Sequence, residues 1–410
     1  MNELPIVLSY NVVAFRKSLR CPIQINITLP CGRTILCRTS YTIVAKEWNR
    51  ELERPENIFK SANKVLNRDL IELKLYLHSI LKTCDGTVLS KTFVQEKINE
   101  FTNLENTLDG SLLFHVRAYI AHKEVSIARN TCKRYKVFAE LLLRFEGYVL
   151  HRYRMDEFNE KFVQCFLLFG KREKYSPATL HRSLHFFKTV LRYFGQRGVK
   201  VAPLDIPIPK PYKQKRPIVL NEKELEKLQG HVFEEEELEI AKDWLLISCY
   251  TGQRISDFMN FDRSNLSHIK GMTCIEFVQK KTKRQVVLPL HPVVLDILKK
   301  RDGTFPPPLA FNYYNRLIKQ VAMRTKLNDR VISSKRKKYR STEGNFKKWE
   351  VLTSHVGRRS FATNFYGKIP TSLLITATGH SSEAMFQQYV NYYDTHKVEL
   401  LGKYFFEEDK

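Results

Sequence analysis

A proline-rich segment near the middle of the chain limits what this sequence can fold into. Residues 203–217 contain five prolines interleaved with three lysines and one arginine. Each proline fixes its own backbone φ angle and lacks the N–H group that a helix or an inner strand needs, so no regular element can continue through the segment. The sequence therefore predicts a semi-extended linker over residues 201–217, with separately folded parts on either side.

Length and charge set the outer bounds on these parts. A chain of 410 residues is too long for one ordinary domain, so two or three domains are expected. Lys and Arg together number 68 against 43 Asp and Glu, which gives a net charge of +25. This excess favours a polyanionic partner, above all nucleic acid, over a protein that is merely basic.

Cysteine spacing and hydropathy argue against several other classes of protein. None of the eight cysteines forms a CxxC pair, which argues against a zinc site, and their scatter indicates reduced thiols. The first residues lack the basic and apolar regions of a signal peptide. No apolar run approaches the roughly 18 residues of a membrane span. We therefore expect a cytoplasmic, nucleoid-associated protein with no membrane partner.

Residues 1–95 are expected to form a small strand-plus-helix module. Apolar residues alternate with polar ones over residues 23–29, which indicates a half-buried strand. A Pro-Cys-Gly-Arg turn at 30–33 leads to a partner strand over 34–40, and a helix follows at about 58–81. The sequence of this module does not indicate what it binds.

Residues 108–200 are expected to be entirely helical, because their apolar residues recur at helical spacing. Ser176 and Pro177 suit an N-cap and a first helical position. Basic residues are interleaved with the apolar ones, which is compatible with a DNA clamp or with ordinary solvated helix faces. The basic residues are Lys133, Arg134, Lys136, Arg144, Arg152, Arg154, Lys171, Arg172, Lys174, Arg182, Lys188 and Arg192.

The C-terminal part, residues 218–410, opens on an Asn-Glu-Lys-Glu sequence that resembles a capping box and predicts a helix start. A second helix leads to Gly252, which ends or bends it, and Arg254 begins the next helical segment. The planar guanidinium of Arg254 matches phosphate oxygens. Asp257 is the carboxylate expected to hold this guanidinium in place.

A basic hairpin and a second basic hairpin or loop are expected in the same part. Residues 275–278 and 286–290 indicate paired strands, and four basic residues lie in the tip between them. Lys281 is the leading candidate among these four for bringing an ammonium group to a leaving oxygen. A denser basic run at 335–340 predicts a DNA-contacting hairpin or loop, with a targeting signal or a solvated loop as alternatives.

Two histidines and an arginine follow this basic run. His355 and Arg358 are three positions apart, so they share one helix face and can converge on one phosphate. His380 comes directly after a Thr-Gly helix break. Each histidine taken alone is more often structural than catalytic, and only the combination singles them out.

Tyr389 is the candidate nucleophile. It stands nine residues after His380, and its hydroxyl can attack a phosphodiester. Tyr392 and Tyr393 are rivals within one turn. The tail over residues 392–406 is apolar enough to pack on its own domain or on a neighbouring protomer.

In their order and spacing, these motifs resemble the tyrosine recombinase, or phage integrase, family over roughly residues 215–400. The matching pieces are Thr-Gly-Gln-Arg ending at Arg254, Lys281 before Thr282, His-x-x-Arg-x-Ser-Phe-Ala-Thr from His355 to Thr363, and Gly-His-x8-Tyr from Gly379 to Tyr389. The departures from the usual pattern are Gln253, Arg359 and Thr378. None of them removes a catalytic group.

The resemblance implies a multidomain, mainly α fold with small β parts. Residues 1–95 look like an α/β arm-binding module, and residues 108–200 look like a helical, SAM-like core-binding domain. Residues 218–410 would then be a mixed, mainly-α tyrosine recombinase catalytic domain with β-hairpins.

A mechanism is also implied by the resemblance. Tyr389 would attack the scissile phosphate and form a 3′-phosphotyrosine. Arg254 and Arg358 would clamp the non-bridging oxygens, where negative charge builds up in the transition state. Because the covalent intermediate conserves the bond energy, no cofactor, ATP or divalent metal would be required.

Three further side chains receive roles from the same resemblance. Lys281 would protonate the departing 5′-hydroxyl. His355 would assist proton transfer, for which its ordinary pKa near neutrality is suited. His380 would donate a hydrogen bond to the phosphate.

The function implied is site-specific DNA recombination, for integration or excision of a mobile element or prophage. The implied partners are double-stranded DNA, three further copies in a synaptic homotetramer, and accessory DNA-bending or directionality factors. Two alternatives are kept. A type IB topoisomerase would relax supercoils with little site preference, and a non-catalytic DNA-binding protein would form no covalent adduct.

Overall fold

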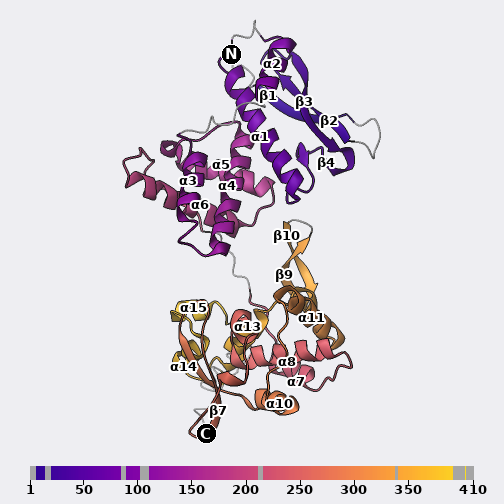
Figure 1. The fold of residues 1–410 in the computed structure, drawn as a ribbon, viewed down its shortest axis with the longest axis vertical. Helices are drawn as coiled ribbons and strands as arrows, with labels where there is room; N and C mark the ends of the chain where they lie inside the picture. Colours follow the sequence, from indigo (N-terminus) through magenta and orange to yellow (C-terminus); the bar gives the residue numbers. More distant parts are fainter. Residues whose placement is uncertain are drawn as a thin grey trace. The chain divides into compact units, whose positions relative to one another are not determined.

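The computed structural model describes residues 6–13, 20–84, 89–101, 110–210, 216–337, 340–390 and 402. They form two compact units, Met1–Tyr212 with Lys337–Ser341, and Lys213–Arg336 with Thr342–Lys410 (Figure 1). The predicted fold class is confirmed, because the elements are mainly helices with small antiparallel sheets. The finer division at residues 95, 108, 200 and 217 stays a prediction. Within the described ranges, no helix is both long and apolar enough to cross a membrane.

The first unit begins with an antiparallel sheet in the order β1-β2-β3. Its strands are β1 (Val7–Val12), β2 (Arg20–Thr28) and β3 (Thr34–Val44). Alternation along β2 buries every second side chain, which confirms the predicted strand pair. β1 was not predicted. Helices α1 (Ser61–Leu81) and α2 (Lys91–Phe101) bury their apolar stripes in the same core as the sheet.

Two very short strands follow this sheet, β4 (Trp48–Asn49) and β5 (Arg54–Pro55). The rest of the first unit is a helical bundle, as its apolar periodicity predicts. The bundle consists of α3 (Leu112–Lys123), α4 (Arg129–Val149), α5 (Glu160–Arg172) and α6 (Pro177–Gly195). Phenylalanines from α4, α5 and α6 fill its core. The predicted start of α6 is confirmed, because the Ser176 side chain accepts a hydrogen bond from the Thr179 backbone N–H.

Helix α8 (Glu236–Thr251) is the central element of the second unit. It is buried along nearly its whole length, and α7 (Glu222–Gln229), α10 (Pro292–Lys300), α11 (Phe311–Arg324) and α13 (Val356–Phe365) pack around it (Figure 1). The predicted capping box at the start of α7 is present. The predicted end of α8 is also present, because Gly252 adopts a left-handed φ of 68°.

The remaining helices of this unit are short. They are α9 (Ile255–Phe258), α12 (Lys348–Val351), α14 (Thr371–Thr378) and α15 (Glu383–Gln387). α13, α14, α15 and the residues just after α15 share a small separate core that contains Phe361, Leu374 and Phe386. The C-terminal motifs therefore lie around one local hydrophobic cluster.

Both predicted basic hairpins of this unit are present. β7 (Met272–Val278) and β8 (Gln285–Pro289) form the first, and β6 (Leu266–Ile269), which was not predicted, extends it into a three-stranded sheet. β9 (Arg330–Lys337) and β10 (Arg340–Lys347) form the second. The base of the second hairpin is anchored by Lys348, whose Nζ lies 2.6 and 2.7 Å from the two carboxylate oxygens of Glu224.

Candidate active site

Arg358 lies at the centre of the candidate site, on the first turn of α13 and with no exposed surface. Its Nη1 donates to the backbone carbonyl of Gly252 at 3.0 Å, and its Nη2 donates to Nε2 of His380 at 2.9 Å. Its buried Nε has no hydrogen-bond partner among the described residues. Burial, reinforced by the charge of Arg254, lowers the pKa of Arg358 to about 10. The guanidinium is thus charged at neutral pH, and its unpartnered Nε–H can donate to an anion.

His380 is held in one tautomer by its two neighbours. A guanidinium has donors only, so Nε2 of His380 must accept from Arg358, and the ring proton must be on Nδ1. That Nδ1 lies 2.8 Å from the Thr378 hydroxyl, which in turn donates to the Leu374 carbonyl at 2.6 Å. Burial and the nearby Arg358 and Arg254 lower the pKa of His380 to about 3. The imidazole is therefore neutral and orients Arg358.

The ring of Tyr389 lies against this pair. Its centroid is 4.8 Å from the centroid of the His380 ring and 5.5 Å from Cζ of Arg358. The Thr363 hydroxyl donates to the Tyr389 carbonyl at 3.4 Å, and the half-buried tyrosine packs on the small core shared by α13 and α14. The rival tyrosines at 392 and 393, and the apolar tail apart from residue 402, lie outside the described residues.

Arg254 is the N-cap residue of α9 and is half-buried. Its Nη1 donates to the side-chain oxygen of Gln279 at 2.9 Å. The expectation that Asp257 holds this guanidinium is wrong, because Oδ1 of Asp257 accepts from the Lys280 backbone N–H at 3.0 Å instead. Asp257 thus binds the turn that follows β7.

Lys281 and His355 lie at the rim of the site. Lys281 is exposed in the turn between β7 and β8, and His355 is exposed at the N-cap of α13. Partial burial and four surrounding cations (Arg359, Arg358, Arg254 and Lys281) lower the pKa of His355. Lys281 is therefore close enough for its charge to act on His355, although the described contacts include no hydrogen bond between them.

The predicted residues thus converge. Arg358, His380 and Tyr389 are in direct contact. Arg254 is near enough to depress the pKa values of both Arg358 and His380, and His355 and Lys281 border the same cationic region. Such a cluster of positive charge matches a phosphate, where it would stabilise additional negative charge.

Sequence reasoning missed two buried glutamines that connect these parts, Gln253 and Gln279. Gln279 receives the hydrogen bond from Arg254, and its amide nitrogen donates to Gln253 at 3.2 Å and to the Thr378 carbonyl at 3.0 Å. A signal was present for part of this network, because Gln253 and Thr378 are two of the three departures from the family pattern. Gln279 carries no such signal.

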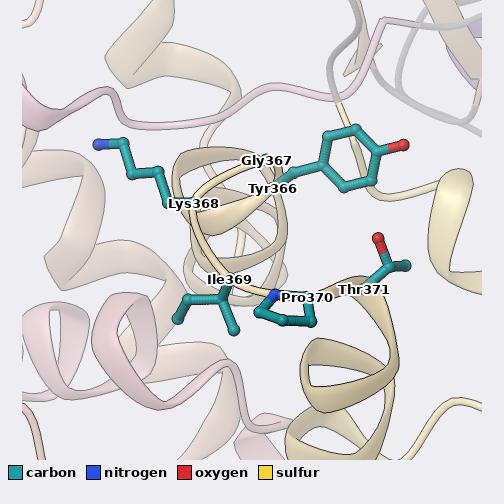
Figure 2. Close-up of a pocket in the computed structure, with 6 residues that line it drawn as sticks. All are labelled: Tyr366, Gly367, Lys368, Ile369, Pro370 and Thr371. Carbon is teal, nitrogen blue, oxygen red and sulfur yellow. The ribbon is translucent and has the colours of Figure 1, made fainter.

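A surface pocket lies nearby, on the loop that joins α13 to α14 (Figure 2). Its lining residues are Tyr366, Gly367, Lys368, Ile369, Pro370 and Thr371. Figure 2 shows these side chains spread along the loop rather than converging on one point. None of the six predicted residues lines this pocket.

Comparison with known proteins gives two kinds of match. The model of the phage integrase family matches residues 219–396. Among the curated proteins, no sequence matches the chain. Three solved structures with a similar fold are described by their titles as complexes with DNA: XerH site-specific recombinase bound to a palindromic difH substrate, the Tn1549 transposon integrase with transposon right end DNA, and a lambda integrase dimer bound to a COC' core site.

The structural matches extend beyond the C-terminal unit. XerH is 15% identical with a TM-score of 0.50, and the alignment covers 82% of this chain and 95% of that one. The Tn1549 integrase is 15% identical with a TM-score of 0.51, and the alignment covers 71% of this chain and 98% of that one. Lambda integrase is 18% identical with a TM-score of 0.50, and the alignment covers 68% of this chain and 95% of that one. At these identities the matches establish the fold alone, and residues 219–396 of the chain are similar to the phage integrase family.

Proposed function

We propose that this chain cuts and rejoins double-stranded DNA at specific sites through a covalent bond between phosphate and Tyr389. The observation that carries the proposal is the direct contact of the Tyr389 ring with His380 and Arg358 inside a cluster of cations. A tyrosine hydroxyl next to a buried arginine with a spare donor suits attack on a phosphodiester. The guanidinium would stabilise the extra negative charge that develops on the phosphate oxygens during the attack.

The proposed reaction begins at Tyr389. The Tyr389 oxygen attacks phosphorus and the bond to the 5′ oxygen breaks, which leaves a 3′-phosphotyrosine. Arg254 and Arg358 hold the non-bridging oxygens in the transition state. Attack by the 5′-hydroxyl of a second DNA end on the phosphotyrosine then restores the phosphodiester and releases the tyrosine, so no external energy source is consumed.

Proton transfer is assigned to the exposed rim. Lys281 donates a proton to the departing 5′ oxygen. His355 is kept neutral near pH 7 by its lowered pKa, so it can accept the proton that Tyr389 loses. His380 acts chiefly through Arg358, because its Nε2 is engaged as an acceptor from that guanidinium.

The remaining assignments stay predictions. They are an arm-binding role for the N-terminal sheet and its helices, a core-binding role for the bundle α3–α6, a synaptic homotetramer, and accessory DNA-bending or directionality factors. A role in a mobile element or prophage, and a cytoplasmic, nucleoid-associated location, belong to the same set. The net charge of +25 supports the partner they share, which is DNA.

The deciding experiment traps the covalent adduct in cells. Wild type, Tyr389→Phe and the matched control Tyr313→Phe are expressed in parallel. The hydroxyl of Tyr313 donates to Glu237 on α8, away from the site. Cells are lysed in denaturant, the protein is purified, and attached DNA is sequenced.

DNA at a few recurring sites, linked to wild type and to Tyr313→Phe but absent from Tyr389→Phe, is the expected result. Scattered linkage without recurring sites would identify a topoisomerase-like activity instead. Linkage to Tyr389→Phe would move the nucleophile elsewhere. Absence of linkage from every variant would leave a DNA-binding protein without cleavage chemistry.

A further inference from the structure

Gln279 is a fully buried amide whose hydrogen-bonding capacity is completely used. Its oxygen accepts from Nη1 of Arg254 at 2.9 Å and from the Thr282 hydroxyl at 2.5 Å. Its nitrogen donates to Gln253 at 3.2 Å and to the Thr378 carbonyl at 3.0 Å. A primary amide offers two donors and two acceptor lone pairs, so no other side chain of this size could satisfy all four partners.

Gln253 extends the same network toward the His380 turn. It is also fully buried, and its nitrogen donates to the backbone carbonyls of Thr251 at 2.7 Å and Ala377 at 2.8 Å. The two amides therefore bind the consecutive carbonyls of Ala377 and Thr378, just before His380. Gly379 fits against them closely, because a Cβ atom there would lie 2.5 Å from the Gln279 oxygen.

The turn that carries Lys281 is fixed by the same residues. Gln279 immediately precedes this turn, and Thr282 within it donates to the Gln279 oxygen. The backbone N–H of Lys280 donates to Asp257 at 3.0 Å, and Nη1 of Arg284 donates to the His380 carbonyl at 2.8 Å. Lys281 is thus an exposed side chain on an anchored turn, and Gln279, which binds Thr282 of that turn, also binds the Arg254 guanidinium.

The neutrality of the amide matters for Arg254. A carboxylate in the place of Gln279 would form an ion pair with this guanidinium and offset the charge that attracts phosphate. An amide oxygen orients the guanidinium and leaves its positive charge uncompensated. The positive charge of Arg254 therefore remains available to stabilise the negative charge that would develop on the phosphate of the substrate.

We propose that Gln279, supported by Gln253, is a positioning residue for DNA cleavage that sets the Arg254 guanidinium and the Lys281 turn together. The proposal rests on the proposed function, since it concerns the same site. It predicts that loss of the amide slows cleavage without weakening DNA binding, because the misplaced groups act at the reacting phosphate. A displacement of about 1 Å at a catalytic group can cost about 10²-fold in rate.

The test compares full-length Gln279→Met, which keeps the length of the side chain, with wild type. The matched control is Gln285→Met, the same substitution at an exposed position on β8 of the same hairpin. Gln253→Leu removes the second amide alone and serves if Gln279→Met does not fold, as judged by circular dichroism and thermal unfolding. The probe is a duplex that carries a site recovered by adduct sequencing. DNA affinity and single-turnover adduct formation at saturating DNA are measured separately.

A second substrate separates the effect of Gln279 on Arg254 from its effect on the Lys281 turn. It carries sulfur in place of the bridging 5′ oxygen, so its leaving group needs no proton from Lys281. We expect Gln279→Met to form adduct about 10²-fold more slowly than wild type on the ordinary duplex, with unchanged affinity. On the sulfur substrate, Lys281→Ala should recover fully, whereas Gln279→Met should recover only in part because Arg254 remains misplaced.

Other outcomes overturn the inference. Adduct formation by Gln279→Met at the rate of Gln285→Met would remove Gln279 from the reaction, and the same result for Gln253→Leu would decide the matter if Gln279→Met is unfolded. Full recovery on the sulfur substrate would contradict any action on Arg254. A wild type that forms no adduct would refute the proposed function itself, and this inference with it.

Discussion

Nη2 of Arg358 lies 2.9 Å from Nε2 of His380, inside a region where neither residue has appreciable exposed surface. The contact requires a neutral histidine, since a protonated ring has no acceptor to offer the guanidinium. It links the protonation of His380 to the stability of the fold and to the orientation of the arginine.

The free energy of unfolding should depend on pH through His380. Its pKa is about 3 in the folded protein and about 6.5 in an unfolded chain. Between these values the unfolded state binds the extra proton, so this contribution to stability is fully present above pH 6.5 and is lost as pH falls toward 3. The slope due to one such group is about 1.4 kcal/mol per pH unit. Urea unfolding of wild type and His380→Gln across this window measures it, and equal slopes would contradict the neutral, buried histidine.

Replacement of Arg254 by lysine should reduce cleavage much more than DNA binding. Lysine keeps the charge but lacks the planar guanidinium, which binds the Gln279 oxygen and would hold two phosphate oxygens in the proposed reaction. We expect single-turnover adduct formation to fall about 10²–10³-fold, as for loss of one transition-state donor. Arg263→Lys, at an exposed position, is the control. Comparable rates in the two variants would exclude Arg254 from the clamp.

Alanine substitutions at two glycines in the left-handed region should distinguish the cost of backbone strain from the cost of a steric clash. Gly379 and Gly271 have φ values of 65° and 77°, but a Cβ at Gly379 would lie 2.5 Å from Gln279, while one at Gly271 would meet nothing within 4 Å. Gly271→Ala should therefore cost only the strain of a left-handed alanine, about 1–2 kcal/mol. Gly379→Ala should cost more and should also slow cleavage. Thermal or urea unfolding of both variants measures the difference, and equal costs would argue against close packing at Gly379.

Neutralising the β9–β10 hairpin should weaken DNA binding and reduce its dependence on salt. Lys335 and Arg336 are exposed on β9, and each phosphate contact that is lost should lower the slope of log K against log salt by about 0.9. Binding of the double variant Lys335→Ala/Arg336→Ala is measured over a series of salt concentrations, with Lys299→Ala on α10 as a control. An unchanged slope would leave the hairpin without a role in binding DNA.

Much of this protein could be read from local sequence. The alternation along β2, the caps at Ser176 and Asn221, and the helix break at Gly252 are properties of a few neighbouring residues, so periodicity and capping chemistry predict them. The types and spacing of the candidate catalytic residues could be recognised in the same way. β6 was missed because a four-residue strand without alternation has no distinct local pattern. β1 does alternate, since Leu8, Tyr10 and Val12 are buried between more exposed residues, so its pattern could have been recognised.

The arrangement of the site was decided by tertiary structure. The side chain of Gln253 binds the carbonyl of Ala377, 124 positions away, and Gln279 binds the carbonyl of Thr378, 99 positions away. Local sequence suggested Asp257 as the partner of Arg254, but the β7–β8 hairpin brings Gln279 to that guanidinium and leaves Asp257 to a backbone N–H. The tautomer of His380 likewise depends on Arg358, from another helix.

Local sequence thus identified which groups are available: two arginines, two histidines, a lysine and a tyrosine, in an order typical of the phage integrase family. Only the folded chain decided which of these groups touch, which are neutral and which amides hold them. The physical reason is that hydrogen-bond partners and burial, which set orientation and pKa, arise from segments far apart in the chain. Composition and residue spacing do not show which distant segments come into contact in the folded chain.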